Sequence, residues 1–540
     1  MVRAVQLPLQ TRLESVAVLA RRRMLRPTRP DRLVRAGLAF ARWGTTPATA
    51  CVVNAITRSE QAAVIDSDGA VTWRELDRRT NALARGFAEL GLKNGQRLAI
   101  LCRNGVGLVE SMTAGAKLGA HVLMLNTSFA ATELTGVLDR EQPRVLVYDE
   151  EFEPLVRDAA TAGAVRVVVG QRGERTLAGL RDAQLESAVD PPPDEGRVVI
   201  LTSGTTGAPK GARIARATGL EPLAWFLSVV PINAGSTCLI PAPLFHAHGL
   251  GQFTIASALG CTVVLPRAFD AEETLALIER HRVEVMAVVP TMLKRIMDLQ
   301  PSVLGSYDTG SLRVVVCSGS ALDARLARSF MARFGPVLYN LYGSTEVAWA
   351  TIAEPDDLLQ APGTVGRPPP HTRLAILDEA GEPLPPGATG RIFVAHEMLF
   401  EGYTDPAKDR SRVKGMLSPG DLGHVDDEGR LYIDSREDDM IVSGGENVYP
   451  GQVEEVLREH PDVGDAVVLG ADDDRFGQRL VAFVVPRPGS GLTEDDVLRF
   501  SRERLARFKV PRDVHLRDDL PRNALGKVLR RDLRADTAAH

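Results

Sequence analysis

The sequence predicts an α/β fold: a large N-terminal domain of mostly parallel sheets flanked by helices, followed by a small α+β C-terminal domain. Two observations support the large domain. Apolar segments at 97–102 (RLAILC) and 121–126 (HVLMLN) indicate buried strands, and the segment between them at 109–120 indicates a helix. This order predicts a parallel pair of strands joined by a right-handed crossover. The length of 540 residues also exceeds that of one ordinary domain.

Further buried strands and intervening helices are predicted along the chain. The strands are expected at 144–149, 166–170, 197–202, 236–242, 283–290 and 313–319, with a helix at 271–281. After about residue 390 the strands become short, and from residue 451 the order is helix, strand, strand, helix. The polar connection SREDDM (435–440) is the expected boundary, so we predict domains at 1–437 and 438–540.

Composition excludes several classes of function. The net charge of −5 argues against a nucleic-acid partner, and no apolar run is long enough to span a membrane. The five cysteines are scattered without a CxxC pair, so neither a disulfide framework nor a zinc site is expected. A reducing, cytoplasmic location fits this pattern best.

The first 43 residues form a basic leader with ten arginines against Glu14 and Asp31. Apolar residues are interspersed, among them Leu13 and Val16. Two interpretations stay open: a basic amphipathic helix on the anionic inner face of a membrane, or a solvated leader in an arginine-rich chain. A cleaved signal is not expected, because no continuous apolar segment follows the charges.

Residues 202–211 (TSGTTGAPKG) follow a predicted buried strand, at the end of the strand where α/β sheets bind ligands. Glycines allow close approach to an anion, successive N–H groups can surround it, and hydroxyls and a lysine add donors. The segment differs from a Walker A loop, because Pro209 precedes the lysine and Gly211 follows it. A flexible Ser/Gly loop is the alternative. The expected phosphate-binding residues are Thr202, Ser203, Gly204, Thr205, Thr206, Gly207 and Lys210.

This loop and the motifs that follow it resemble the signature of the adenylate-forming enzymes, the superfamily of acyl-CoA synthetases, peptide-synthetase adenylation domains and luciferases. The resemblance covers about residues 50–535. The segments SGGENVYP (443–450) and DDDRFGQRLVAFVV (472–485) are most similar in style to bacterial fatty acyl-CoA synthetases.

Two motifs resemble the family's acyl and adenine sites. In PLFHAHGL (243–250), the resemblance places His246 near the substrate carboxylate and the α-phosphate, with His248 as the rival histidine. Relatives that activate amino acids carry an acidic residue where this chain has His246, so an acid without an α-amine is expected. In CSGSALD (317–323), Gly319, Ser320 and Ala321 would line the adenine and acyl sites.

The segment YGSTE (342–346) resembles the family's nucleotide and metal motif. The resemblance stacks Tyr342 on adenine, with Gly343 beside it, points Thr345 at the α-phosphate and gives Glu346 a Mg²⁺ ion that bridges the ATP phosphates. Mg²⁺ prefers hard oxygen ligands, so a carboxylate suits this role.

The second half of the chain supplies the ribose, hinge and thiol motifs. By resemblance, Asp421 in SPGDLG (418–423) and Arg436 would bind the ribose, although Ser435 stands where the family usually has glycine. Asp438 falls at the family's hinge, and the resemblance implies that the small C-terminal domain is mobile about it. Gly444 and Gly445 fall on the loop that borders the CoA tunnel.

Lys527 lies in PRNALGKVLRR (521–531) and matches the family's catalytic lysine, which bridges the carboxylate and the α-phosphate. An ammonium there would offset the negative charge of the transition state. The segment also matches a P-x-x-x-x-G-K pattern that some lysine acetyltransferases recognise, and acetylation would remove this charge.

Together these features predict a fatty acid–CoA ligase that uses Mg²⁺, ATP and CoA as cofactor and co-substrates. An apolar region at 220–262 is expected to shape the acyl tunnel. A fatty acyl-AMP ligase that loads a carrier protein and an aryl acid–CoA ligase stay open. A luciferase-like oxygenase and a non-catalytic nucleotide-binding relative are less consistent, because Lys527 and Glu346 are both present and no oxygenase signature is found.

Overall fold

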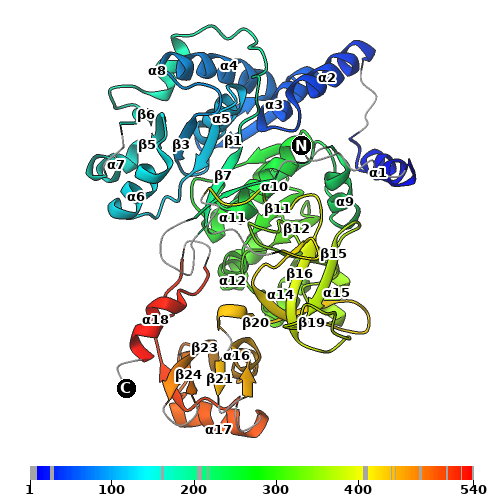
Figure 1. The fold of residues 1–540 in the computed structure, drawn as a ribbon, viewed down its shortest axis with the longest axis vertical. Coiled ribbons are helices and arrows are strands. Elements are labelled where there is room, and N and C mark those ends of the chain that lie inside the picture. Colours follow the sequence, from blue (N-terminus) through cyan, green and yellow to red (C-terminus); the bar gives the residue numbers. More distant parts are fainter. Residues whose placement is uncertain are drawn as a thin grey trace. The chain divides into compact units, whose positions relative to one another are not determined.

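The computed structural model describes residues 9–24, 29–159, 163–202, 210–215, 217, 219–404, 412–439, 441–443, 446–473, 477–505, 509–523 and 526–537 (Figure 1). The chain forms two compact units. Unit 1 comprises Met1–Leu359, Pro369–Thr372 and His396–Arg410, and unit 2 comprises Gln360–Pro368, Arg373–Ala395 and Ser411–His540.

Unit 1 contains two large sheets. The eight-stranded sheet has the order β14 (Thr351–Ala353), β13 (Leu338–Tyr342), β12 (Val314–Cys317), β11 (Val285–Val288), β9 (Thr237–Leu239), β10 (Thr262–Val264), β1 (Ala62–Asp66) and β2 (Gly69–Thr72). The six-stranded sheet has the order β6 (Val165–Val169), β5 (Val145–Asp149), β3 (Arg97–Leu101), β4 (His121–Met124), β7 (Val198–Thr202) and β8 (Lys210–Arg213). Most neighbouring pairs in both sheets are parallel.

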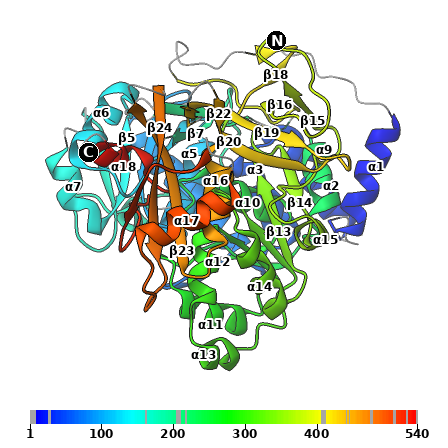
Figure 2. The same cartoon turned by 90° about the horizontal axis from the view of Figure 1, so that it is seen from below.

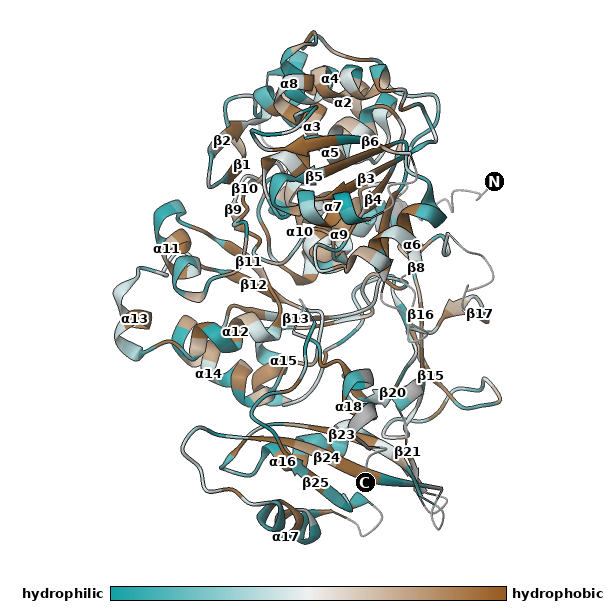
Figure 3. Cartoon of the chain, turned by 90° about the vertical axis from the view of Figure 1, so that its left-hand side faces the viewer, coloured by the Kyte–Doolittle hydropathy of each residue, from teal (hydrophilic) through white to brown (hydrophobic). Residues whose placement is uncertain are grey.

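Helices surround these sheets. They are α1 (Leu9–Arg21), α2 (Pro30–Trp43), α3 (Pro47–Thr57), α4 (Trp73–Glu89), α5 (Val106–Lys117), α6 (Ala131–Glu141), α7 (Glu153–Asp158), α8 (Leu177–Asp182), α9 (Glu221–Val229), α10 (Ala247–Ala258), α11 (Ala271–His281), α12 (Pro290–Met297), α13 (Pro301–Ser306), α14 (Ala324–Phe334) and α15 (Pro355–Gln360). Strands β3 and β5 are mostly brown in Figure 3, whereas α11 shows a hydrophilic face. Strands of parallel sheets are covered on both faces, which explains their nearly continuous apolar segments.

Unit 2 contains two smaller sheets, each mostly antiparallel. The first pairs β17 (Arg412–Val413), β18 (Met416–Leu417), β16 (Gly390–Ala395), β19 (Asp421–Val425) and β20 (Leu431–Arg436), with β15 (Arg373–Leu377) also on β16. The second pairs β22 (Glu446–Val448), β21 (Ile441–Ser443), β24 (Gly477–Pro486) and β23 (Val463–Asp473), with β25 (Asp513–Leu516) also on β24. Helices α16 (Pro450–Arg458), α17 (Glu494–Arg504) and α18 (Arg530–Thr537) complete it (Figure 2).

The predicted fold class is confirmed, with element boundaries that shift by a few residues. The helix predicted at 271–281 has these bounds because the Asp270 side chain accepts a hydrogen bond from the Glu273 N–H and caps its first turn. The helix predicted at 109–120 begins three residues earlier, as α5. The predicted boundary at Asp438 lies in a short 3-10 helix (Glu437–Asp439) between β20 of the first small sheet and β21 of the second.

Candidate active site

Three predicted motifs lie at one edge of the eight-stranded sheet. Strands β11, β12 and β13 are parallel neighbours, so their carboxyl ends meet at that edge. The predicted residues 319–321 follow β12, and Tyr342 is the last residue of β13. His248 lies there too, because its Nε2 is 3.0 Å from the carbonyl oxygen of Val288, the last residue of β11. Ligands of open α/β sheets bind at this edge.

The two candidate histidines differ in what their rings contact. His246 is the residue immediately before α10, and its Nε2 is buried with no hydrogen-bond partner among the described residues. His248 uses Nε2 on the Val288 carbonyl, although its Nδ1 is also buried and unpartnered within the same described part. Desolvation lowers the pKa of each ring to about 4, so both are neutral at pH 7. A backbone carbonyl holds the ring of His248 in place, whereas Nε2 of His246 is available for a hydrogen bond to a ligand.

Glycine is required in the turn after β13. A Cβ atom on Gly343 would lie 2.1 Å from the carbonyl oxygen of Ala348, which is closer than any contact allows. The Ser344 hydroxyl accepts hydrogen bonds from the backbone N–H groups of Glu346 and Val347, at 3.2 and 3.4 Å. The turn therefore holds Thr345, which is half-buried, and the buried Glu346 in a fixed conformation.

The carboxylate of Glu346 is held by a residue that the sequence analysis missed. The buried hydroxyl of Tyr403 donates a hydrogen bond of 2.5 Å to Glu346 Oε1. The N–H of Phe400 donates to the Glu346 carbonyl at 2.8 Å. Glu346 is thus oriented through both its side chain and its backbone, which is how a carboxylate is positioned for a ligand.

Tyr403 belongs to a segment, residues 396–404, that we call the brace. At its start, His396 Nε2 lies 2.8 Å from the carbonyl oxygens of both Val347 and Trp349, and its Nδ1 accepts from the Met398 N–H at 3.0 Å. These partners assign the ring proton to Nε2. Burial lowers the pKa of His396, which favours this neutral form. The brace therefore contacts the turn after β13 at both ends.

The brace also reaches the predicted phosphate loop. Strands β7 and β8 form an antiparallel hairpin in which Thr202 pairs with Lys210, so the loop closes at its ends. The N–H of Thr404 donates to the Gly211 carbonyl at 2.7 Å, and Ala212 forms a β-bridge with Tyr403. The brace thus links the β7–β8 hairpin of the six-stranded sheet to Glu346, which follows β13 of the eight-stranded sheet.

Several predicted loop residues fall outside the described part of the chain. For Thr202 and Lys210 only the backbone is described, and Ser203, Gly204, Thr205, Thr206 and Gly207 lie in the segment that is not described. Gly444 and Gly445 lie outside it as well, and so does the side chain of Asp438.

In unit 2, the two predicted ribose residues face each other. Asp421 and Arg436 are paired across β19 and β20, and Arg436 Nη1 lies 3.1 Å from Asp421 Oδ1. Asp421 is buried, as is Ser435 beside it. An aspartate so placed offers acceptor oxygens for two vicinal hydroxyls.

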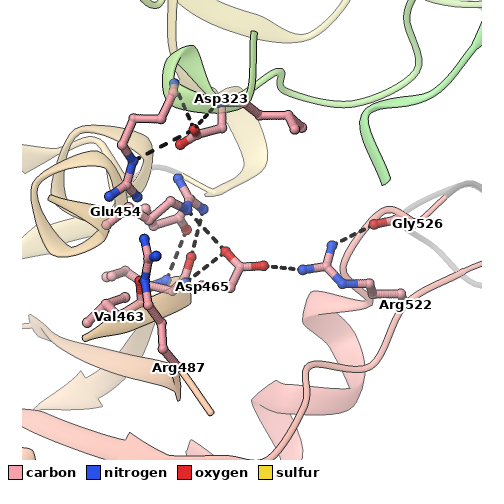
Figure 4. Close-up of polar contacts among 12 residues, drawn as sticks. Asp323, Glu454, Val463, Asp465, Arg487, Arg522 and Gly526 are labelled. Atoms are coloured by element: carbon pink, nitrogen blue, oxygen red, sulfur yellow. Dashed lines mark hydrogen bonds and ion pairs between the residues drawn. The ribbon is translucent and has the colours of Figure 1, made fainter. Parts of the chain in front are cut away.

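Lys527 lies in a tight hairpin of unit 2. Its N–H donates to the Asn523 side chain at 2.9 Å, and its carbonyl accepts from the Asn523 N–H at 2.9 Å. Gly526 has a φ of +74°, a conformation that glycine adopts without strain. Figure 4 shows the guanidinium of Arg522 between the carbonyl of Gly526, at 2.7 Å, and the carboxylate of Asp465, which fixes the hairpin on β23.

The charges of Asp421 and Arg436 act on Lys527. Desolvation and the positive charge of Arg436 lower the pKa of Lys527, and the carboxylates of Asp421 and Asp439 oppose this shift. The residue nevertheless keeps exposed surface. Unit 2 therefore gathers the predicted catalytic lysine and both predicted ribose residues.

The order of these motifs along the chain agrees with one family. The model of the AMP-binding enzyme matches residues 53–404, and the model of the AMP-binding enzyme C-terminal domain matches residues 452–527. The chain belongs to the AMP-binding enzyme family. The predicted adenylate-forming architecture and the predicted ATP-dependent, AMP-forming acid–thiol ligase are both confirmed by this membership and by the relatives.

The relatives of this AMP-binding enzyme act on different acids. An indoleacetate–CoA ligase of Aromatoleum aromaticum is 34% identical over 479 residues, covering 86% of this chain and 92% of its own. A fatty acid–[acyl-carrier-protein] ligase of Streptomyces coeruleorubidus is 34% identical over 493 residues, covering 87% of this chain and 92% of its own. The crystal structure of ATP-bound MatB from Rhodopseudomonas palustris superposes on this chain with a TM-score of 0.81 at 29% sequence identity. The match covers 88% of this chain and 96% of the MatB chain.

Two signals in the sequence could have identified the brace. The aromatic Tyr403 follows Gly402 and precedes the polar segment TDP, which is typical of a strand end rather than of a core strand. His396 follows the strand GRIFVA (390–395), again at a strand end. Polar and aromatic residues that directly follow strands are candidates for a site, and the family model also ends at residue 404.

Proposed function

We propose that this enzyme is a fatty acid–CoA ligase that works in two steps. In the first, the substrate carboxylate oxygen attacks the α-phosphorus of ATP, and pyrophosphate leaves. In the second, the CoA thiol attacks the acyl carbon of the acyl-adenylate, and AMP leaves. The observation that carries the first step is the buried carboxylate of Glu346. Tyr403 orients this carboxylate and also bridges to the β7–β8 hairpin, which carries the predicted phosphate loop.

The described residues suit a magnesium ion that is held mainly by the nucleotide. They contain no group of three histidine, cysteine, aspartate or glutamate residues that could hold a metal, so a site built entirely from these side chains is not available in that part of the chain. Mg²⁺ in nucleotide sites is commonly held by one or two carboxylates together with phosphate oxygens. Glu346 would hold it, and the ion would neutralise charge on the departing pyrophosphate.

Each remaining site residue has a proposed task in the first step. The buried Nε2 of His246 would donate a hydrogen bond to the reacting carboxylate or phosphate, and as a neutral ring it would add no net charge. Asp421 and Arg436 would bind the ribose, Tyr342 the adenine and Thr345 the α-phosphate. Lys527 would offset the charge that accumulates as two anions react.

An apolar packing region beside α10 supports a substrate with an apolar tail. A small apolar cavity of about 10 Å³, room for one water molecule rather than for an acyl chain, lies between the eight-stranded sheet and α10, the helix that begins directly after His246. Cys238, Ile240, Ala256 and Ala287 are among its lining residues, so the side chains that meet between α10 and the sheet are apolar and would have to separate to admit an aliphatic chain. No acidic side chain follows Phe245, which supports an acid without an α-amine.

CoA is the acceptor that we propose, through a rotation of the C-terminal domain about Asp438. Lys527 is needed only in the first step, and the thiol needs a path to the acyl carbon in the second. The 3-10 helix at Glu437–Asp439 connects two separate sheets, and short connections of this kind absorb the φ/ψ changes of hinges.

Two alternatives rest on the relatives. The name of the A. aromaticum enzyme supports an aryl-substituted acid, and the name of the S. coeruleorubidus enzyme supports transfer to a carrier protein.

Lys527 is also proposed as a target of a lysine acetyltransferase, because it keeps exposed surface on a hairpin. Detection of acetyl-Lys527 in protein from the native host, together with loss of the first step, would support that regulation.

The test is to incubate the pure enzyme with Mg²⁺, ATP, CoA and single acids, from acetate to oleate, with indoleacetate as the aryl probe. AMP, acyl-AMP and acyl-CoA are followed by mass spectrometry. Acyl-CoA from medium or long aliphatic acids is the expected result. Thioester only from indoleacetate would assign an aryl acid, and acyl-AMP without thioester would assign a carrier-protein acceptor.

A further inference from the structure

Helices α1 and α2 precede the part of the chain that the family model matches, which begins at residue 53. Both belong to unit 1, and they lie on the right-hand side of that unit in Figures 1 and 2. Each helix packs one face on the enzyme. Leu19 of α1 is buried in the main core, and Arg22 Nε donates to the Leu227 carbonyl of α9 at 3.0 Å. Ala39 and Trp43 of α2 are buried in a cluster with Ala48 of α3.

Each helix also has a second apolar face that is open to solvent. On α2, Val34 and Leu38 are four residues apart and are 63% and 60% exposed, and Leu33 beside them is 52% exposed. Gly37 lies within this face, and a Cβ atom there would have no neighbour within 4 Å in the described structure. On α1, Leu13 and Val16 are 61% and 51% exposed. We call these five residues, with Gly37, the open apolar face.

The number of exposed large apolar side chains on these two helices is unusual for the molecule. In the described part of the chain, seven large apolar residues are exposed, and five of them lie on these two helices. Scattered exposed leucines need no explanation, but a cluster with helical spacing indicates an interaction surface.

Arginines border the open apolar face. The exposed Arg12 lies one turn before Val16, and the exposed Arg35 lies beside Val34 and three residues before Leu38. The first 43 residues carry ten arginines against two acidic residues. A second copy of the chain would bring two strongly positive segments together, and like charges oppose such an interface. A bilayer with anionic headgroups offers both an apolar layer and the opposite charge.

We propose that α1 and α2 dock the enzyme on the surface of an anionic lipid bilayer, with the open apolar face in the acyl boundary and the flanking arginines on the headgroups. This is a peripheral contact. No helix in the described residues is long and apolar enough to cross a membrane. The proposal is independent of which acid the active site uses.

The test measures co-sedimentation of the full chain with phosphatidylcholine vesicles, with and without phosphatidylglycerol. Strong binding is expected only with phosphatidylglycerol, and it should fall as salt is added. Val34→Asp with Leu38→Asp should reduce the partition coefficient roughly tenfold or more, because two charges enter the acyl boundary. Arg12→Gln with Arg35→Gln should reduce it roughly fivefold for each arginine removed.

The matched control is Leu185→Asp, because Leu185 is 73% exposed but lies outside both helices. This variant should bind like the parent, and all variants should keep the parental unfolding temperature. Equal binding to both kinds of vesicle, no binding to either, or the same loss in Leu185→Asp would each overturn the proposal. A dimer in analytical ultracentrifugation that Val34→Asp with Leu38→Asp dissociates, without vesicle binding, would assign the face to a second copy instead.

Discussion

Replacing Tyr403 with phenylalanine tests whether the brace positions the carboxylate of Glu346. The substitution removes one hydroxyl and keeps the ring, which is buried and packs edge-on against Phe400 with 5.0 Å between ring centroids. The lost bond joins a hydroxyl to a buried carboxylate at 2.5 Å. Hydrogen bonds to charged groups contribute about 1.5–3 kcal/mol.

If that energy serves the transition state of adenylation, its loss lowers the rate roughly tenfold to a hundredfold, since about 1.4 kcal/mol corresponds to a factor of ten. The assay is acid-dependent exchange of pyrophosphate into ATP, which isolates the first step, repeated over a series of Mg²⁺ concentrations. A carboxylate that has lost its orientation should also require more Mg²⁺ for half-maximal exchange, and a merely structural role for Tyr403 would not change this requirement.

The matched control is Tyr148→Phe. Tyr148 is also buried, and its hydroxyl donates a bond of 2.5 Å to Glu153, but it lies on β5, away from the predicted motifs. This variant should exchange pyrophosphate like the parent. The reasoning fails if Tyr403→Phe exchanges pyrophosphate at the parental rate with an unchanged Mg²⁺ requirement, or if both variants lose activity equally.

Three further results are expected. Lys527→Ala should slow pyrophosphate exchange roughly a hundredfold or more while thioester formation from supplied acyl-adenylate persists, and parental exchange would contradict its role. Asp438→Pro, which fixes φ at the hinge, should preserve exchange and block thioester formation, and equal loss of both steps would exclude a hinge there. Burial lowers the pKa of His246 and His248 to about 4, so the unfolded chain, with histidine pKa values near 6.5, binds more protons between these values. The free energy of unfolding should therefore decrease as the pH falls from about 6.5 towards 4, and His246→Leu should flatten this decrease in denaturant titrations.

The sheets were predictable because their strands are covered on both faces. Segments such as Leu98–Leu101 of β3 are buried throughout, so they appear in the sequence as uninterrupted apolar residues. The exact end of β11 was not predictable, because strand length depends on which neighbours pair. The segment predicted at 283–290 forms only four paired residues, Val285–Val288, and Pro290 instead begins α12.

Candidate site residues were predictable where short motifs that resemble those of the family coincide with strand ends, as at Tyr342 and Asp421. The brace was missed because its contacts join residues far apart in sequence. Tyr403 and Glu346 are separated by 57 positions, and neither residue type indicates the other. The sequence predicts an amphipathic helix within residues 1–43 as one of two interpretations, but it does not predict which residues of α2 stay exposed. The helix is apolar on two faces, and composition does not distinguish a face that packs from one that does not.

The contact between His396 and Trp349 gives the enzyme an intrinsic optical probe. The indole of Trp349 stacks on the imidazole of His396 with 5.5 Å between ring centroids and 3° between ring planes, directly beside the turn that holds Glu346. Any movement of that turn when nucleotide arrives changes this stacking and therefore the emission of the indole. Because the chain has only four tryptophans, replacing the other three would leave a single-tryptophan enzyme whose fluorescence follows nucleotide binding in real time.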